Sequence, residues 1–167
     1  AAPDHGVVFK RLDVGGRQVH AHSAFVNEVV LSTGLESQGV KVSTIEHLLS
    51  ALSALGIDNL LVELDSFEVP IMDGSALEFV RGFLATGLIK QSKPVHALEI
   101  LETVEAKENG AYAALAPFSG IEMEFEIDFP DAAIGQQSKS LNLANGSIVH
   151  GLCDSRTFCR NSDVALM

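Results

Sequence analysis

The sequence has few basic residues, few cysteines and no long hydrophobic run. Its 167 residues include 11 Lys and Arg against 22 Asp and Glu, a formal net charge of −11. Because an acidic protein repels phosphate backbones, nucleic acid is not expected as the main partner. No apolar run approaches the roughly 20 residues that cross a bilayer, and the first residues lack the basic and apolar regions of a signal peptide.

Cysteine is too scarce to build a disulfide framework. The two cysteines, Cys153 and Cys159, fit the reduced thiols of a cytoplasmic protein. Hydrophobic residues make up 47% and charged residues 20% of the chain, which is the composition of a folded protein. We therefore expect a cytoplasmic protein with one ordinary domain or two small ones.

The two ends of the sequence are unusual. The chain begins with Ala1 instead of a methionine, and residues 160–167 read as the start of a helix without a stop signal. These ends fit a piece of a longer protein, or a small protein with ragged ends. Composition leaves both interpretations open.

The first half of the chain alternates between strand and helix patterns. Helical spacing of apolar residues predicts a helix over 45–55 that Gly56 ends, and Ser43 and Glu46 form the S-x-x-E pattern of a capping box. The same pattern at Ser75 and Glu78 predicts a second helix that Gly87 ends. Strands are predicted over 7–14 and 18–22 (a hairpin turned by Gly15 and Gly16), 24–34, 40–42 and 59–64, with a tight loop at 70–74.

Residues 90–94 are polar and contain a proline, so they form a candidate linker. After it, strands are predicted over 97–106, 111–116, 121–129 and 141–143, with a turn at 108–110 and a short helix over 147–153. The order of these elements predicts an α+β fold in two layers.

The pair Glu46-His47 is the most informative candidate for chemistry. An imidazole ligates Zn²⁺, and a neighbouring carboxylate is placed to take a proton from zinc-bound water. A structural interpretation stays open, in which Glu46 closes the capping box and His47 is an ordinary residue of the first turn. Catalytic zinc also needs three protein ligands, and one histidine does not make a site.

The other histidines give weaker signals. His20 and His22 share one face of a predicted strand, which also fits a solvent-facing surface. His150 and Asp154 share a helix face, as ligands or as an exposed pair. One alternative therefore joins His47 to His150 and Asp154 in a self-contained metal site.

Several motifs follow one another in order across nearly the whole chain: Ser43-Thr44-Ile45-Glu46-His47-Leu48, Gly56-Ile57-Asp58-Asn59, residues 68–76 (EVPIMDGSA), Phe79-Val80, residues 125–129 (FEIDF) and Ser155-Arg156-Thr157-Phe158. Together they resemble one enzyme family, the zinc-dependent UDP-3-O-acyl-N-acetylglucosamine deacetylases of lipid A biosynthesis. The first and third of these motifs carry the most specific agreement.

The resemblance implies two similar α+β domains, each a sheet backed by helices. In this chain they would be a nearly complete first domain over 1–91, which lacks its N-terminal strand, and an incomplete second domain over 92–167. Two further zinc ligands of the family lie in a late motif that this sequence does not contain, and the distal histidine that acts as an acid in the family is missing too. The chain would then be a fragment truncated at both ends and inactive alone.

The resemblance also assigns roles to four residues. Glu46 matches the general base, His47 matches one zinc ligand, Thr157 matches the residue that stabilises the oxyanion, and Phe158 lies near the substrate. The implied reaction removes the N-acetyl group of UDP-3-O-acyl-N-acetylglucosamine by attack of zinc-bound water. The alternative from another class is a non-catalytic binding or scaffold module that kept the fold and lost the metal.

Overall fold

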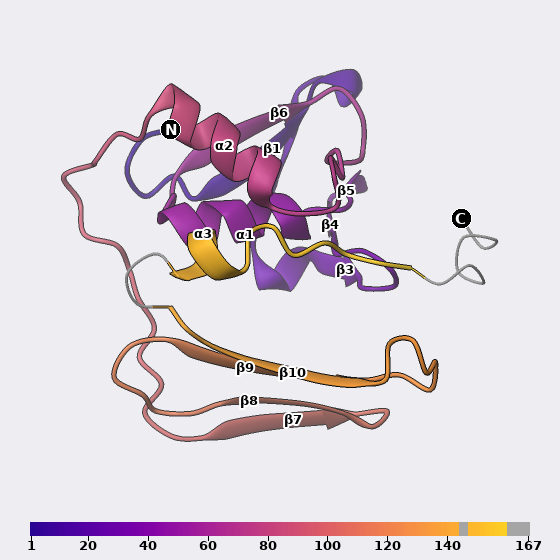
Figure 1. Ribbon diagram of the computed structural model, residues 1–167. Helices are drawn as coiled ribbons and strands as arrows, with labels where there is room; N and C mark the ends of the chain where they lie inside the picture. The colour runs from indigo at the N-terminus through magenta and orange to yellow at the C-terminus, as the bar shows by residue number, and fades with distance from the viewer. Residues whose placement is uncertain (144–146, 160–167) are drawn as a thin grey trace. The chain divides into compact units, whose positions relative to one another are not determined.

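The computed structural model describes residues 1–143 and 147–159. It divides into two compact units (Figure 1), which are residues 1–94 with the described residues from Val149 onward, and Val95–Ile148. The residues predicted to start a terminal helix, 160–167, lie outside the described part. The mixed α+β class is confirmed, and the division into enzyme domains at residues 91 and 92 stays a prediction.

The first unit is built on two small sheets. One has the order β2-β1-β6, in which central β1 (Val7–Arg11) pairs antiparallel with β2 (Arg17–His20) and parallel with β6 (Leu60–Leu64). The other joins β3 (Val26–Glu28), β4 (Gly34–Ser37) and β5 (Val40–Val42) as an antiparallel meander. The predicted hairpin is confirmed, although its first strand ends at Arg11 and continues as a 3₁₀ turn, Leu12–Val14.

Part of the region predicted as a strand over 24–34 is not a strand. Its start belongs to a second 3₁₀ turn, Ser23–Phe25, and the segment between β3 and β4 is a loop. This loop contains Thr33, which contacts Glu46. Within the predicted segment, Val26–Glu28 forms β3 and Gly34 begins β4, with Val26 opposite Leu35 and Glu28 opposite Gly34.

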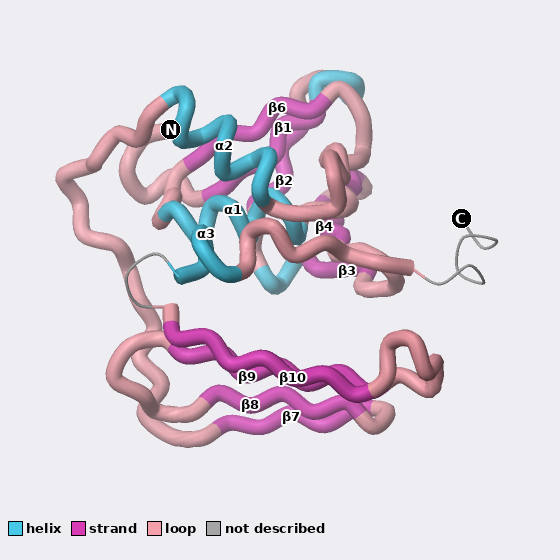
Figure 2. The backbone as a smooth tube through the Cα atoms, viewed as in Figure 1, coloured by secondary structure: helices cyan, strands magenta, loops and turns pink. Residues whose placement is uncertain are grey.

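The described residues form three α-helices (Figure 2): α1 (Glu46–Leu55) and α2 (Leu77–Thr86) in the first unit, and α3 (Ser147–Gly151), which belongs to that unit from Val149 onward. Both predicted stop signals are confirmed. Gly56 ends α1 with a left-handed backbone, φ 63°, which only glycine adopts without strain. Gly87 ends α2, and its N–H donates to the Phe83 carbonyl.

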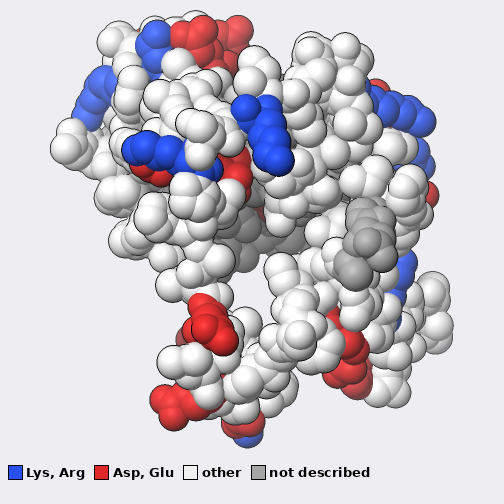
Figure 3. All heavy atoms as spheres, turned by 90° about the vertical axis from the view of Figure 1, so that its left-hand side faces the viewer, with Lys and Arg blue, Asp and Glu red and all other residues white. Residues whose placement is uncertain are grey.

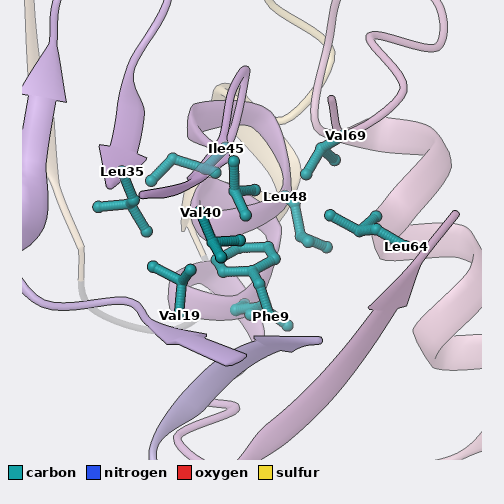
Figure 4. Packing of buried hydrophobic residues seen from close by; sticks show 10 residues of the cluster. Phe9, Val19, Leu35, Val40, Ile45, Leu48, Leu64 and Val69 are labelled. Carbon is teal, nitrogen blue, oxygen red and sulfur yellow. The ribbon is translucent and has the colours of Figure 1, made fainter. Parts of the chain in front are cut away.

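The core of the first unit fills the space between the sheets and α1 (Figure 4). Its members are apolar residues from every strand of the two sheets except β3, from α1 and its N-cap Ile45, and from the loop after β6: Phe9, Val19, Leu35, Val40, Val42, Ile45, Leu48, Leu52, Leu64 and Val69. Each such side chain contributes roughly 1.5–3 kcal/mol when fully buried. Burial on this scale fixes α1 against the sheets, and therefore fixes the residues at its N-terminus.

A second, smaller cluster joins the three helices. Ala51 of α1 and Val80 of α2 pack with Cys153, which follows α3, and all three are nearly inaccessible to solvent. Burial raises the pKa of the Cys153 thiol, which donates to the Val149 carbonyl at 2.7 Å. The cluster therefore anchors the segment that leads into residues 155–158.

The second unit contains two antiparallel hairpins: β7 (Val104–Glu108) with β8 (Ala111–Leu115), and β9 (Glu122–Asp128) with β10 (Gln136–Asn142). Asn109 and Gly110 both have positive φ, as a two-residue hairpin turn requires, so the predicted turn is confirmed. Two predictions are wrong here: residues 97–103 are not a strand, and β10 begins well before residue 141.

Basic side chains of the described residues are commonly paired with acidic ones. Ion pairs join Lys10 to Glu63 at 2.8 Å and Arg81 to Glu78 at 2.7 Å. On the face drawn in Figure 3, blue and red side chains lie next to one another without a continuous basic surface among the described residues. Among those residues, no helix is both long and apolar enough to span a membrane.

Candidate functional site

Glu46 is the first residue of α1, and its carboxylate is held by the loop between β3 and β4. Oε2 accepts the Thr33 N–H at 3.0 Å, while the Thr33 carbonyl accepts the Ile45 N–H at 3.2 Å. Among the described residues, nothing donates to the second carboxylate oxygen, Oε1. The Thr33 N–H therefore orients the carboxylate through Oε2, and Oε1 can accept a hydrogen bond or a proton from another group.

The predicted capping box before α1 is wrong. The N-cap position is Ile45, which has no side-chain cap, and the Ser43 hydroxyl lies 3.2 Å from the Ser32 hydroxyl instead. The cause is Thr44, whose left-handed backbone, φ 58°, turns the chain just before the helix. Glu46 consequently points to Thr33, and the structural interpretation of Glu46 as a capping residue fails.

Thr44 is in an unfavourable conformation, because a β-branched residue rarely adopts positive φ. Contacts on both sides hold it there. Ser43 forms a parallel bridge with Glu68, with backbone bonds of 2.8 Å to Phe67 and 3.0 Å to Val69, and the buried Thr44 hydroxyl donates to Glu68 Oε1 at 2.7 Å. The S-T-x-E-H motif and the E-V-P-I motif are thus joined at this point.

Replacing Thr44 with valine is expected to lower the free energy of unfolding by about 1 kcal/mol, because the hydroxyl bond to Glu68 is lost while the shape is kept. Urea unfolding measures the change. Glu68→Gln is the matched variant: its amide oxygen still accepts the bond, so the loss should be smaller. A Thr44→Val protein as stable as the wild type would contradict this role of the hydroxyl.

His47 follows Glu46 on the first turn of α1 and is half-buried. Within residues 1–143 and 147–159, no three His, Cys, Asp or Glu side chains lie where they could hold one metal ion. The self-contained site of His47 with His150 and Asp154 is therefore wrong. The described donors around His47 do not by themselves fit a complete zinc site, because catalytic zinc takes three protein ligands.

His20 and His22 do not form a ligand pair. His20 lies on β2, whereas His22 precedes a 3₁₀ turn, and its Nδ1 accepts the Ala24 N–H at 3.1 Å. The ring of His22 also meets Phe25 edge-on, with 6.1 Å between centroids. Structural contacts account for His22.

The loop before α2 is organised by Asp73. Its Oδ1 accepts both the N–H of Ser75, at 3.1 Å, and the Ser75 hydroxyl, at 2.7 Å. The Ser75 oxygen in turn accepts the Leu77 N–H at 3.1 Å. The second predicted capping box is therefore also wrong. The N-cap position is Ala76, which has no side-chain cap, and Asp73 binds the Ser75 N–H while Glu78 pairs with Arg81.

The R-T-F segment lies on this same loop, although the two are far apart in sequence. The Thr157 N–H donates to the Gly74 carbonyl at 2.8 Å, and Arg156 directs Nε and Nη2 at Asp73 Oδ2, at 3.4 and 3.3 Å. Gly74 has φ 82°, and a Cβ built there would lie 3.6 Å from the Thr157 methyl carbon. Phe158 is 54% exposed beside them.

The electrostatics of the loop favour ionised Asp73. Hydrogen bonding from the Ser75 hydroxyl is the largest cause that lowers the pKa of Asp73, with smaller contributions from the Ser75 N–H and from Arg156, against some desolvation. The stability that this carboxylate contributes is present above its ordinary pKa of 3.8 and is lost as the pH falls through its lower folded-state pKa.

A carboxyl titration followed by NMR is expected to place the pKa of Asp73 below 3.8. Ser75→Ala should raise it more than Arg156→Gln does, because the serine makes the larger contribution. Asp13, whose pKa is lowered mainly by its bond to Arg11, is the internal control and should not move in either variant. If the pKa of Asp73 did not change in Ser75→Ala, the Ser75 hydroxyl would not be the main cause of the lowered pKa.

The structure thus builds two anchored groups, Glu46 with His47 at α1, and Thr157 with Phe158 on the Asp73 loop. Sequence reasoning missed Thr33 and Asp73 as orienting residues. Asp73 had a signal, since Asp two residues before Ser is typical of a side-chain turn, whereas Thr33 acts through its backbone and leaves no signal.

Comparison with known proteins identifies the family. The model of the LpxC family, UDP-3-O-acyl N-acetylglycosamine deacetylase, matches residues 1–167. The chain belongs to this family. All of the ordered motifs lie within the matched residues.

Curated relatives agree with the LpxC assignment. UDP-3-O-acyl-N-acetylglucosamine deacetylase of Ruthia magnifica is 48% identical over 169 residues, which cover 100% of this chain and 56% of the relative. The Xanthomonas oryzae protein of the same name is 39% identical, with 100% and 56% covered, and that of Psychrobacter arcticus 40%, with 98% and 52%. The chain spans about half the length of these relatives.

Proposed function

We propose that this chain is part of an enzyme that removes the N-acetyl group from UDP-3-O-acyl-N-acetylglucosamine in lipid A biosynthesis. The observation that carries the proposal is the family match over residues 1–167, which includes the oriented Glu46 at the start of α1. Water adds to the acetamide carbonyl, the C–N bond breaks, and acetate and a free amine are released. A cytoplasmic location belongs to the same proposal.

Glu46 is proposed as the general base. A base has to be held within reach of the proton that it abstracts. The Thr33 N–H holds Oε2, and Oε1 is left to accept a proton from the attacking water. Burial of α1 against the core keeps this geometry without help from the substrate.

Zinc is expected of the family, and it would supply a polarised carbonyl and an acidic water. His47 is proposed as one ligand, and its place beside Glu46 on α1 supports that role. The described residues supply no second and third ligand around it, so the complete site needs donors beyond this set.

Thr157 and Phe158 are proposed as substrate-facing residues. A hydroxyl donor near the reacting carbonyl stabilises the negative charge that develops there, and the backbone of Thr157 is fixed on Gly74. Phe158 offers exposed aromatic surface next to it, as an apolar part of a substrate requires.

The test is acetate release by the full-length, zinc-loaded protein from UDP-3-O-acyl-N-acetylglucosamine, with loss of activity on chelation and recovery with zinc. Absence of acetate from a folded, zinc-loaded protein would overturn the proposal. Binding of the nucleotide sugar without turnover would instead favour the alternative, a non-catalytic module.

A further inference from the structure

Asp73 connects two of the family motifs, residues 68–76 and residues 155–158. One carboxylate oxygen binds Ser75 twice, within its own loop, and the other faces the guanidinium of Arg156, 83 residues further along the chain. Ser75 is completely buried, so it gives the carboxylate a fixed support. Asp73 Oδ2 is thereby held in a fixed position, where it accepts hydrogen bonds from Arg156.

The residue next to that contact is Thr157. Its N–H is bound by Gly74, which lies between Asp73 and Ser75, so successive residues of the R-T-F segment are attached to successive residues of the loop. On the other side, Cys153 is buried against α1 and α2, and the Ser155 N–H donates to the Leu152 carbonyl at 2.9 Å. The backbone is therefore held in place both at Thr157 and in the residues that precede it, 153–156.

The strength of the ion pair alone does not explain this arrangement. The side chain of Arg156 is 68% exposed, and exposed pairs contribute little to stability. What the contact supplies is geometry, because it sets the register of residues 156 and 157 on the loop. Misplacing a catalytic group by about 1 Å can cost 10²-fold in rate.

We propose that Asp73 is a positioning residue for Thr157, acting through Arg156 and the Gly74 carbonyl. This inference rests on the proposed function. It requires that loss of the Asp73 charge lowers catalysis only while the Thr157 hydroxyl is there to be positioned.

The experiment is a double-mutant cycle in the full-length protein. Asp73→Asn keeps an oxygen for Ser75 and removes the charge that faces Arg156, so kcat should fall about tenfold while KM stays within about twofold. In a Thr157→Val background the same substitution should change kcat less than about twofold. Glu78→Gln, which breaks the exposed pair with Arg81 on α2, is the matched control and should leave kcat unchanged.

An equal loss of kcat in both backgrounds, or no loss in either, would overturn the inference. If Asp73→Asn does not fold, Arg156→Gln removes the same pair from its exposed side, and the same non-additivity with Thr157→Val is expected.

A second readout separates this inference from the proposed function. In the 167-residue chain, Asp73→Asn should speed hydrogen exchange of the Thr157 amide about tenfold, with no change in Glu78→Gln. If the full-length wild type released no acetate but this exchange changed as expected, the proposed function would fail and the positioning contact would stand. Unchanged exchange would refute the contact itself.

Discussion

Replacing Glu46 with glutamine is expected to lower kcat of the full-length enzyme by about 10²–10⁴-fold, the usual contribution of a general base. Glutamine keeps an oxygen that accepts the Thr33 N–H, so the side chain should stay in place on α1. It loses the capacity to take a proton at the second oxygen. Steady-state acetate release with UDP-3-O-acyl-N-acetylglucosamine measures the change.

Folding and catalysis have to be separated in this variant. Because the bond to Thr33 is kept, the unfolding midpoint of Glu46→Gln should stay close to that of the wild type. Glu63→Gln makes the same chemical change on β6, where the carboxylate pairs with Lys10, and should leave kcat unaffected. A Glu46→Gln enzyme within threefold of wild-type kcat would refute the role of base.

The position of Glu46 on α1 could be predicted from the sequence, but the orientation of its carboxylate could not. The S-x-x-E pattern and the helical spacing predicted α1 to within one residue, because both depend on neighbours along the chain. The direction of the carboxylate depends on the left-handed turn at Thr44, which is held by Glu68, and on the backbone of Thr33. Neither partner lies within the local pattern, so a capping box was predicted instead.

The wrong strand predictions in the second unit have the same origin. Residues 97–103 contain apolar residues at strand-like spacing, but they pair with no strand among the described residues, and unpaired backbone does not make a ladder. Conversely, the polar start of β10 is a strand because it pairs with β9, with Gln136 opposite Asp128. Strand formation is decided by the partner more than by propensity.

The motifs predicted more about the site than periodicity did. Agreement in motif order assigned residues 68–76 and 155–158 to one family, although nothing in their spacing predicts contact between them. The structure supplies the physical link, the Thr157 bond to Gly74 and the Arg156 pair with Asp73. The roles of Glu46, His47, Thr157 and Phe158 stay predictions for the experiments above.

The core of the first unit holds α1, and with it Glu46 and His47, in place. Phe9 is the core residue whose replacement should lower the stability of this unit most. Phe9 is completely buried on central β1, opposite Val19 on β2 and Val62 on β6. Phe9→Ala is expected to lower the free energy of unfolding of this unit by about 3–5 kcal/mol, since lost transfer energy and a cavity add together. The loss is a large fraction of the stability of an ordinary domain.

The measurement should follow each unit separately, because the chain divides into two. Urea unfolding by NMR, with methyl signals of Leu48 and Leu52 for the first unit, reports the expected change. Phe118→Ala makes the same substitution at a side chain that is 58% exposed in the second unit, and should cost less than about 0.5 kcal/mol. If both variants lost the same stability, Phe9 would not be the centre of the core that holds α1 and Glu46 in place.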